Sequence, residues 1–511
     1  MKKIVKSALL VIIMMLISKV LGLLREIFLA QQFGTSYIVD AYTVACTLPT
    51  VLFTLFASGF SNSYLPVYMR INDLEKKHFF FNNLTSVLTA FSLVITGACL
   101  LASSAIAKIL APGFNEETYQ LTVRFVQGIV FYLPFYTAFN IFTAQATAHE
   151  DFIASNFCDF IVCNVVVIIS IVLATPERPM VLIYGYVASM VIATVLMGLR
   201  LKQKKYVKFS FSFKVNDSSF LQICSLALPM GIAMLTNQIN SVVDKMFSSS
   251  LGEGITSALS YANKVQLIPY SLITSIFLSL CLPRMNMCFA NGDNKNGLSY
   301  SKRAFSIAMF IAVPIIFAIF AFSKPMIALL FERGAFDSEA TSITATCLVC
   351  YAIGMPFYAF REIAAKTLSA ILQQKRVLKN TIIAVIVNIL FNIIFVKILG
   401  YRGLALATSV AGFFAAVLMN IDLKKNQLVI LEKTMFVDFL KISTASVVSV
   451  GLAFGCYNPI SGATGAPIAT IISLCLAAIV YLLICMVWDV DIMIWGYGNF
   501  PQRFKIIKKW N

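Results

Sequence analysis

Charged side chains are scarce in this sequence of 511 residues. Asp, Glu, Lys and Arg make up 12% of the chain, about half the share usual in soluble globular domains. This scarcity excludes a soluble globular domain. Apolar runs long enough to cross a bilayer recur from one end to the other, and the mean hydropathy is +0.84. The sequence therefore predicts an all-α polytopic membrane protein.

Several residues and motifs that carry chemistry are also rare or missing. There are two histidines, His78 and His149, both in expected loops, which argues against a histidine-based metal site or proton relay. The chain contains no Gly-Lys phosphate loop and no Ser-His catalytic pattern. The twelve cysteines fall almost entirely within apolar runs, where small buried hydrophobes are the expected role. We therefore predict no enzyme activity and no bound cofactor.

The apolar runs predict about fourteen transmembrane helices. Their ranges are 7–30, 38–68, 80–111, 120–147, 154–174, 179–199, 219–249, 255–282, 303–331, 340–371, 379–399, 402–423, 436–456 and 466–488.

Basic residues concentrate in alternate loops. The N-terminus, the even-numbered loops other than the fourth, and the C-terminal tail are rich in Lys and Arg. The richest is the sixth loop, RLKQKKYVKFSFSFK (200–214); the fourth, HED, breaks the pattern. The positive-inside rule then places both termini in the cytoplasm. Much of the formal charge of +17 follows from this topology, so no nucleic-acid partner is implied.

Two stretches of the chain resemble each other. LREIFLAQQFG (24–34) and VVDKMFSSSLG (242–252) each have an acid eight positions before a glycine, and Pro66 and Pro283 follow at matching distances. We infer two six-helix lobes in a pseudo-symmetric repeat, with a substrate site at the repeat interface. The predicted parts are an N-terminal lobe, a basic linker, a C-terminal lobe, two further helices and a basic tail, at 1–200, 201–218, 219–423, 424–490 and 491–511.

Charges also occur where the membrane interior is expected. Lys19, Arg25 and Glu26 lie in the first span, Asp40 in the second and Lys264 in the eighth. Each such charge costs roughly 2.5–3.5 kcal/mol at the bilayer centre, so a partner, a water-filled cavity or a charged substrate must offset it. Guanidinium and ammonium groups suit phosphate oxygens, which predicts a cavity for a phosphate-bearing substrate. The alternative is internal pairing, Arg25 with Asp40 or Lys19 with Glu26.

A second set of residues supplies oxygen ligands. Asn388 and Asn392 share one helical face, and Thr408 and Asp244 lie on other helices. If these four converge, they would suit a monovalent cation such as Na⁺. The alternative is that the amides and the hydroxyl form hydrogen bonds between helices.

The segment SKVLGLLREIFLAQQFGTSYIVDAY (18–42) resembles the opening of the MurJ (MviN) family of lipid II flippases, in the MOP exporter superfamily. YANKVQL (261–267), KPMIALLFERGAF (324–336) and NIIFVKILGYRGLALATS (392–409) look like the same family. The resemblance implies fourteen helices and the flipping of undecaprenyl-pyrophosphate-linked peptidoglycan precursor across the bacterial cytoplasmic membrane by alternating access.

The resemblance also implies a site; the energy source and the partners are further expectations for a flippase. Lys19, Arg25, Asp40 and Lys264 would line a cavity for the pyrophosphate, with Glu26 beside them. Na⁺ or the membrane potential would bias the cycle. The implied partners are the lipid-linked glycan, membrane lipids and the cell-wall synthesis machinery.

The sequence departs from the family pattern at four charged positions: Phe53, Ser58, Asn263 and Gln266 stand in their place. These losses leave other functions open. One is a flippase for another polyprenyl-linked surface polysaccharide, and another is a multidrug or cation antiporter. A polytopic glycan polymerase would need a large outer loop, whereas the outer loops here are short. A non-transporting scaffold in envelope assembly is the remaining alternative.

Overall fold

The computed structural model describes residues 2–53 and 59–488. Most of these residues are helical, and no strand occurs among them. Within them, ten helices are long and apolar enough to cross a bilayer. An eleventh span results if α16 (Ser338–Ala352) and α17 (Met355–Ala370), which meet at 43°, form one broken span. The predicted all-α membrane fold is confirmed, whereas the count of fourteen and the position of both termini stay predictions.

The chain forms two compact units. The first runs to Ser257 and includes Arg333–Asp337; the second comprises Ala258–Glu332 and the chain from Ser338 onward. The division into five parts that the sequence predicts is not tested by these two units and stays a prediction.

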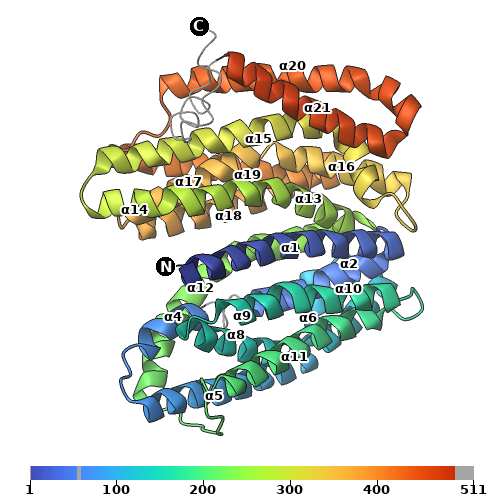
Figure 1. Ribbon diagram of the computed structural model, residues 1–511. Coiled ribbons are helices and arrows are strands. Elements are labelled where there is room, and N and C mark those ends of the chain that lie inside the picture. Colours follow the sequence, from blue (N-terminus) through green and yellow to red (C-terminus); the bar gives the residue numbers. More distant parts are fainter. Residues whose placement is uncertain (1, 54–58, 489–511) are drawn as a thin grey trace. The chain divides into compact units, whose positions relative to one another are not determined.

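The first unit contains twelve α-helices and a π-helix among its described residues (Figure 1). They are α1 (Lys2–Phe33), α2 (Tyr37–Ala45), α3 (Thr47–Phe53), α4 (Gly59–Tyr68), α5 (Leu74–Leu101), α6 (Ser103–Leu110), α7 (Glu116–Ile129), α8 (Tyr132–Ala148), α9 (Phe152–Phe157), the π-helix η2 (Cys158–Val162), α10 (Cys163–Leu173), α11 (Met180–Gln203) and α12 (Ser218–Ser248).

Side-chain caps set where several helices begin. Asp73 accepts a hydrogen bond from the backbone of Glu75 at the start of α5, and Asn115 accepts one from Thr118 at the start of α7. Asp217 does the same for two amides of α12. Such caps satisfy amides that have no partner within the helix. The loops between predicted spans thus supply the residues that end one helix and start the next.

The core of the first unit is aromatic and lies among α4, α5, α8 and α11. Tyr64 stacks on Tyr68 and packs against Phe80, and Phe81 stacks on Phe142. Tyr64 also donates a hydrogen bond to Gln145, with 2.6 Å between the two oxygens. This bond satisfies the one polar atom of a ring that is 1% exposed.

Glycines with positive φ let loops of the first unit approach closely. A Cβ on Gly34 (φ +57°) would lie 2.2 Å from the carbonyl oxygen of Ala335. A Cβ on Gly254 (φ +80°) would lie 2.3 Å from that of Thr35. Only glycine fits both the backbone conformation and the space. The loop after α1 is thereby held against two others, and Ala335 donates a backbone hydrogen bond to Gln31.

The second unit is built from α13 onward (Figure 1). Its elements are α13 (Ile255–Ile276), the π-helix η3 (Phe277–Cys281), α14 (Leu282–Ala290), α15 (Asn294–Phe331), α16, α17, α18 (Gln374–Leu399), α19 (Tyr401–Lys425), α20 (Lys433–Thr464) and α21 (Ala466–Val487).

The last two helices form a hairpin that packs on α15. Phe322 of α15 is fully buried in a cluster with Val450 and Ala453 of α20 and Ala477 of α21. Tyr481 of α21 donates a hydrogen bond of 2.8 Å to the carbonyl oxygen of Phe310. The hairpin is therefore an integral part of the second unit.

Candidate functional site

The charged pair on α1 is the centre of the candidate site. Nε and Nη2 of Arg25 donate to one oxygen of Glu26, over 3.2 Å and 3.0 Å. The Arg25 side chain is 31% exposed, and that of Glu26 is 5% exposed. These two bonds use two of the five guanidinium donors, which leaves three N–H groups for a ligand. Arg25 can thus be held by Glu26 and still present a fork.

Other polar groups of the first unit surround this pair. Tyr42 of α2 and Tyr186 of α11 lie close enough to Arg25 to interact with its charge. Ser18 lies about two turns before Arg25 on α1, and its hydroxyl accepts a hydrogen bond of 3.5 Å from Asn164 of α10. Lys19 follows and is exposed. The structure therefore places Lys19, Arg25 and Glu26 along one helix that faces polar groups of α2, α10 and α11.

Asp159 is an acid in this region that the sequence reasoning missed. It lies on η2, the π-turn inside the span that joins α9 to α10, and it interacts electrostatically with Tyr132 and Tyr136 of α8. The Tyr132 ring in turn packs on Tyr136 and Tyr186, with centroids 5.5 Å and 4.9 Å apart. The sequence did contain an indication of this residue, because Asp159 is a single acid within an apolar run. The π-turn, frequent at functional sites, adds to it.

Asp40 has a different environment from Arg25. One of its oxygens accepts from the backbone N–H of Gly254 and the other from that of Ser257, each over 2.7 Å. Asp40 as a whole is 1% exposed. The carboxylate therefore caps the N-terminus of α13 from another helix, where the helix dipole favours an anion. The pairing of Arg25 with Asp40 is not among these bonds, and the pairing of Lys19 with Glu26 stays a prediction.

The second unit carries the other expected site residues. Lys264 is half-buried on α13, and Asn263 beside it is exposed. Gln266, one of the departures from the family pattern, is 3% exposed and donates to the carbonyl oxygen of Tyr351 over 3.4 Å. Gln266 therefore joins α13 to α16 within this unit. Phe53 is the last residue of α3, but its side chain is outside the described part of the structure. Ser58 lies outside the described residues altogether.

The four candidate cation ligands fall in both units. Asn388 and Asn392 are fully buried on α18, and Nδ2 of Asn392 donates to Oδ1 of Asn388 over 3.2 Å. Thr408 of α19 donates to the carbonyl oxygen of Leu404. Asp244 is half-buried on α12 of the first unit. Among the described residues no group of three or more His, Cys, Asp and Glu side chains is placed to hold a metal ion.

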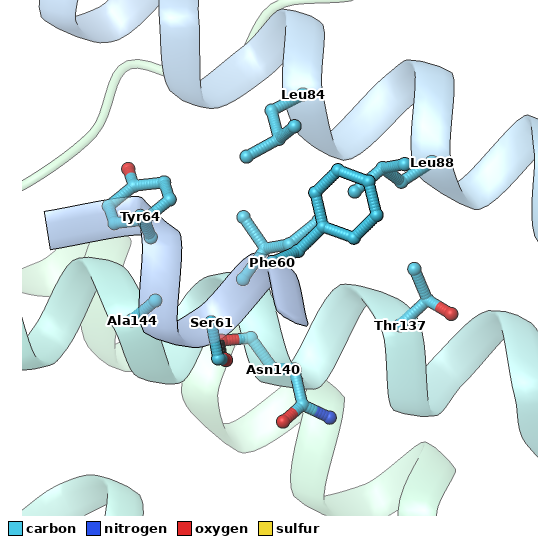
Figure 2. A pocket seen from close by; sticks show the side chains of 9 residues that line it. Phe60, Ser61, Tyr64, Leu84, Leu88, Thr137, Asn140 and Ala144 are labelled. Atoms are coloured by element: carbon cyan, nitrogen blue, oxygen red, sulfur yellow. Dashed lines mark hydrogen bonds between the residues drawn. The ribbon is translucent and has the colours of Figure 1, made fainter. Parts of the chain in front are cut away.

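A closed cavity inside the first unit is too small for a substrate. Figure 2 shows Phe60 of α4 between Leu84 and Leu88 of α5, with Thr137 and Asn140 of α8 opposite. Its volume is about 10 Å³, room for about one water molecule. This cavity is a packing feature of the core, so it does not compete with the α1 site.

The sequence is similar to a known family along most of its length. The model of the family described as "Lipid II flippase MurJ" matches residues 29–486. A relative from Rickettsia prowazekii, described as a probable lipid II flippase MurJ, is 25% identical over 415 residues, 80% of this chain and 82% of the relative. The lipid II flippase MurJ of Burkholderia cenocepacia is 24% identical over 507 residues, 96% and 97% of the two chains.

Solved structures show a similar fold. One of lipid II flippase MurJ in an inward closed conformation matches with a TM-score of 0.81 at 24% identity, covering 95% of this chain and 100% of that one. An inward-facing multidrug resistance transporter of the MATE family, in the MOP superfamily, matches with a TM-score of 0.67 at 15% identity, over 80% and 94%.

Proposed function

Because this chain belongs to the lipid II flippase MurJ family, we propose that it moves lipid II from the inner to the outer leaflet of the bacterial cytoplasmic membrane. Flipping needs no covalent chemistry on the substrate. The protein would bind the head group in a polar site while the polyprenyl chain stays in lipid, and would open to each side in turn. The likeness to multidrug transporters concerns the fold alone.

The arrangement of Arg25 is the observation that supports this proposal most. A guanidinium that keeps three N–H donors beside a buried carboxylate can bind two oxygens of a pyrophosphate at once. Lys19, exposed two turns earlier on α1, adds a second cation as a point charge. Lys264 belongs to the second unit, and its role in binding the pyrophosphate stays a prediction from the sequence. Asp40 and Glu26 would act by positioning rather than by contact with phosphate.

The test is complementation in a bacterium depleted of its own lipid II flippase, with outward exposure of labelled lipid II as the readout. We expect the chain to restore growth and exposure. Arg25→Ala should abolish exposure, and Arg25→Lys should retain part of it because the charge remains while the fork is lost. Arg402→Ala is the matched control, since Arg402 is an exposed arginine whose guanidinium lies over the ring of Tyr401.

Failure of the unaltered chain, with the protein shown to be in the membrane, would favour the second candidate. That candidate is a flippase for another polyprenyl-linked surface polysaccharide. The specific observation behind it is the loss of two acids at Asn263 and Gln266, of which Gln266 serves the packing of α13 on α16. Full activity of the Arg25→Ala variant would remove the phosphate-clamp argument for either glycan.

Energy coupling through Na⁺ is part of the proposal. The buried Asn388–Asn392 pair supports it, because Nδ2 of Asn388 has no hydrogen-bond partner among the described residues. Rotation of both amides would keep the bond between them and turn the oxygen of Asn388 toward a cation. Thr408 of the same unit could add a hydroxyl oxygen, whereas the inclusion of Asp244 stays a prediction from the sequence. Outward exposure of lipid II should then fall when Na⁺ is replaced by choline, and Asn388→Leu should remove that dependence. Exposure that is indifferent to Na⁺ leaves the membrane potential as the energy source.

A further inference from the structure

The connection between α11 and α12 is an extended segment with two different faces. It carries Lys204, Lys205, Lys208 and Lys214, and no acid until Asp217. Phenylalanine and serine alternate from 209 to 213. In extended chain, alternate side chains point to opposite sides. Phe211 is 85% exposed and Phe213 is 51% exposed, whereas Ser210 and Ser212 reach the polar groups of α5.

Two buried asparagines of α5 fix this segment in place. Asn82 donates to the carbonyl oxygen of Lys208 over 2.7 Å and accepts from the N–H of Ser210. Asn83 accepts from the N–H of Lys214 over 2.6 Å and donates to its carbonyl oxygen over 2.9 Å. Amide side chains thereby pair with the backbone as a neighbouring strand would. The phenylalanines are presented by a fixed backbone.

The segment crosses α5 at the depth expected for the membrane surface. α5 has 28 residues and is about 42 Å long, against a hydrocarbon core of about 30 Å. Its first two turns contain Glu75, Lys76, Lys77 and His78, so they extend beyond the core on that side. The contacts at Asn82, Asn83 and Ser86 follow directly. The segment therefore lies where head groups meet acyl chains.

We propose that residues 204–215 form a binding site for anionic phospholipid head groups, in which Phe211 and Phe213 enter the acyl-chain boundary and the four lysines contact phosphates. Exposed aromatic rings in water are unfavourable, and a run of four lysines without an acid in the same segment attracts anions. An acidic lipid surface satisfies both. Phe209 packs edge-on to Phe81 and Phe142 and so joins the start of the segment to the core of the unit. This assignment does not depend on the transported substrate.

Depth-dependent fluorescence quenching tests the insertion. Trp488, Trp495 and Trp510 are first replaced by phenylalanine, and Phe211→Trp then introduces one tryptophan at a position too exposed to disturb packing. In nanodiscs, we expect stronger quenching by lipids brominated near the head group than by lipids brominated at mid-chain. Lys295→Trp is the control, because α15 is about 57 Å long and its first turn extends well beyond the bilayer core. Quenching of the Phe211→Trp protein no greater than that of the control would overturn the proposal.

The preference for anionic lipid is tested in the same system. Brominated phosphatidylglycerol should quench more than brominated phosphatidylcholine at equal mole fraction, with about fivefold enrichment for each lysine that engages a head group. K204Q/K205Q/K208Q/K214Q should bring the two lipids to equality. K375Q/K379Q/K424Q/K425Q removes the same charge from exposed positions at the first turns of α18 and the last turn of α19, and should change nothing. Equal quenching by both lipids in the Phe211→Trp protein with its four lysines intact would overturn the assignment. A segment that binds a soluble partner instead of lipid would give that result.

Discussion

Asp40→Asn is the substitution whose outcome the structure defines most sharply. Asp40 uses one oxygen for Gly254 and the other for Ser257, and both bonds are 2.7 Å long and buried. Asparagine has one oxygen, so it keeps one of these bonds and turns an NH₂ group toward the other backbone N–H. The change therefore removes one charge-assisted bond, weakens the second and leaves a buried donor facing a donor.

The magnitude follows from those losses. A hydrogen bond to a charged group contributes about 1.5–3 kcal/mol, and a buried donor without an acceptor costs about 1–3 kcal/mol. We expect Asp40→Asn to lower the free energy of unfolding by about 2–4 kcal/mol. For a unit of this size that corresponds to a fall of roughly 5–10 °C in the unfolding midpoint.

Asp217→Asn is the matched control. Asp217 caps α12 through a single oxygen, which accepts from Ser219 over 3.0 Å and from Phe220 over 3.1 Å. Asparagine can keep both of these bonds, so this variant should stay within about 0.5 kcal/mol of the parent. Thermal unfolding of the purified proteins in nanodiscs, followed by circular dichroism, measures both. Equal midpoints for the two variants would refute the capping argument, and unchanged stability with lost lipid II exposure would assign Asp40 to the substrate.

Three further outcomes follow from the first unit. Gly185→Ala should lower the unfolding midpoint, because its Cβ would lie 1.9 Å from that of Ser170, whereas Gly97→Ala should leave it unchanged because nothing lies within 4 Å there. Asn83→Ala should speed tryptic cleavage at the lysines of 204–214, since it releases the backbone of that segment; an unchanged cleavage rate would contradict its role. Burial lowers the pKa of His149 below its ordinary 6.5, and nearby cations lower it further by a smaller amount. The neutral ring therefore stabilises the fold fully above about pH 6.5, and this stability is lost as the pH falls below that value. His149→Gln should flatten the unfolding midpoint between pH 5 and 7, and an equally steep profile would contradict this.

The comparison of sequence and structure is clearest at α1. Neighbouring residues of a helix point about 100° apart, so the sequence led us to consider Asp40 for Arg25 and Lys19 for Glu26 as partners. The structure shows that the long arginine side chain reaches back to its neighbour. Rotamers of long side chains are decided by what surrounds them, and a helical wheel does not contain that information.

Asp159 shows a different limit. Its position in an apolar run is visible in the sequence, yet its environment depends on the π-turn at Cys158–Val162 and on tyrosines from α8. A π-turn shifts the register of a helix by one residue, and no composition rule predicts where this occurs. The same holds for Asn82 and Asn83, whose partners lie more than 120 residues away.

By itself the sequence determined the all-α membrane architecture, the basic loops and the family, because hydrophobic length and charge distribution act locally along the chain. It also predicted Arg25 as one of three cations of the site, together with Lys19 and Lys264. Only the tertiary structure decided that Asp40 caps α13, that Glu26 holds Arg25 and that Phe211 and Phe213 face outward from α5. Those outcomes depend on which backbone amides and side chains meet across helices, and that is fixed by packing between segments distant in sequence.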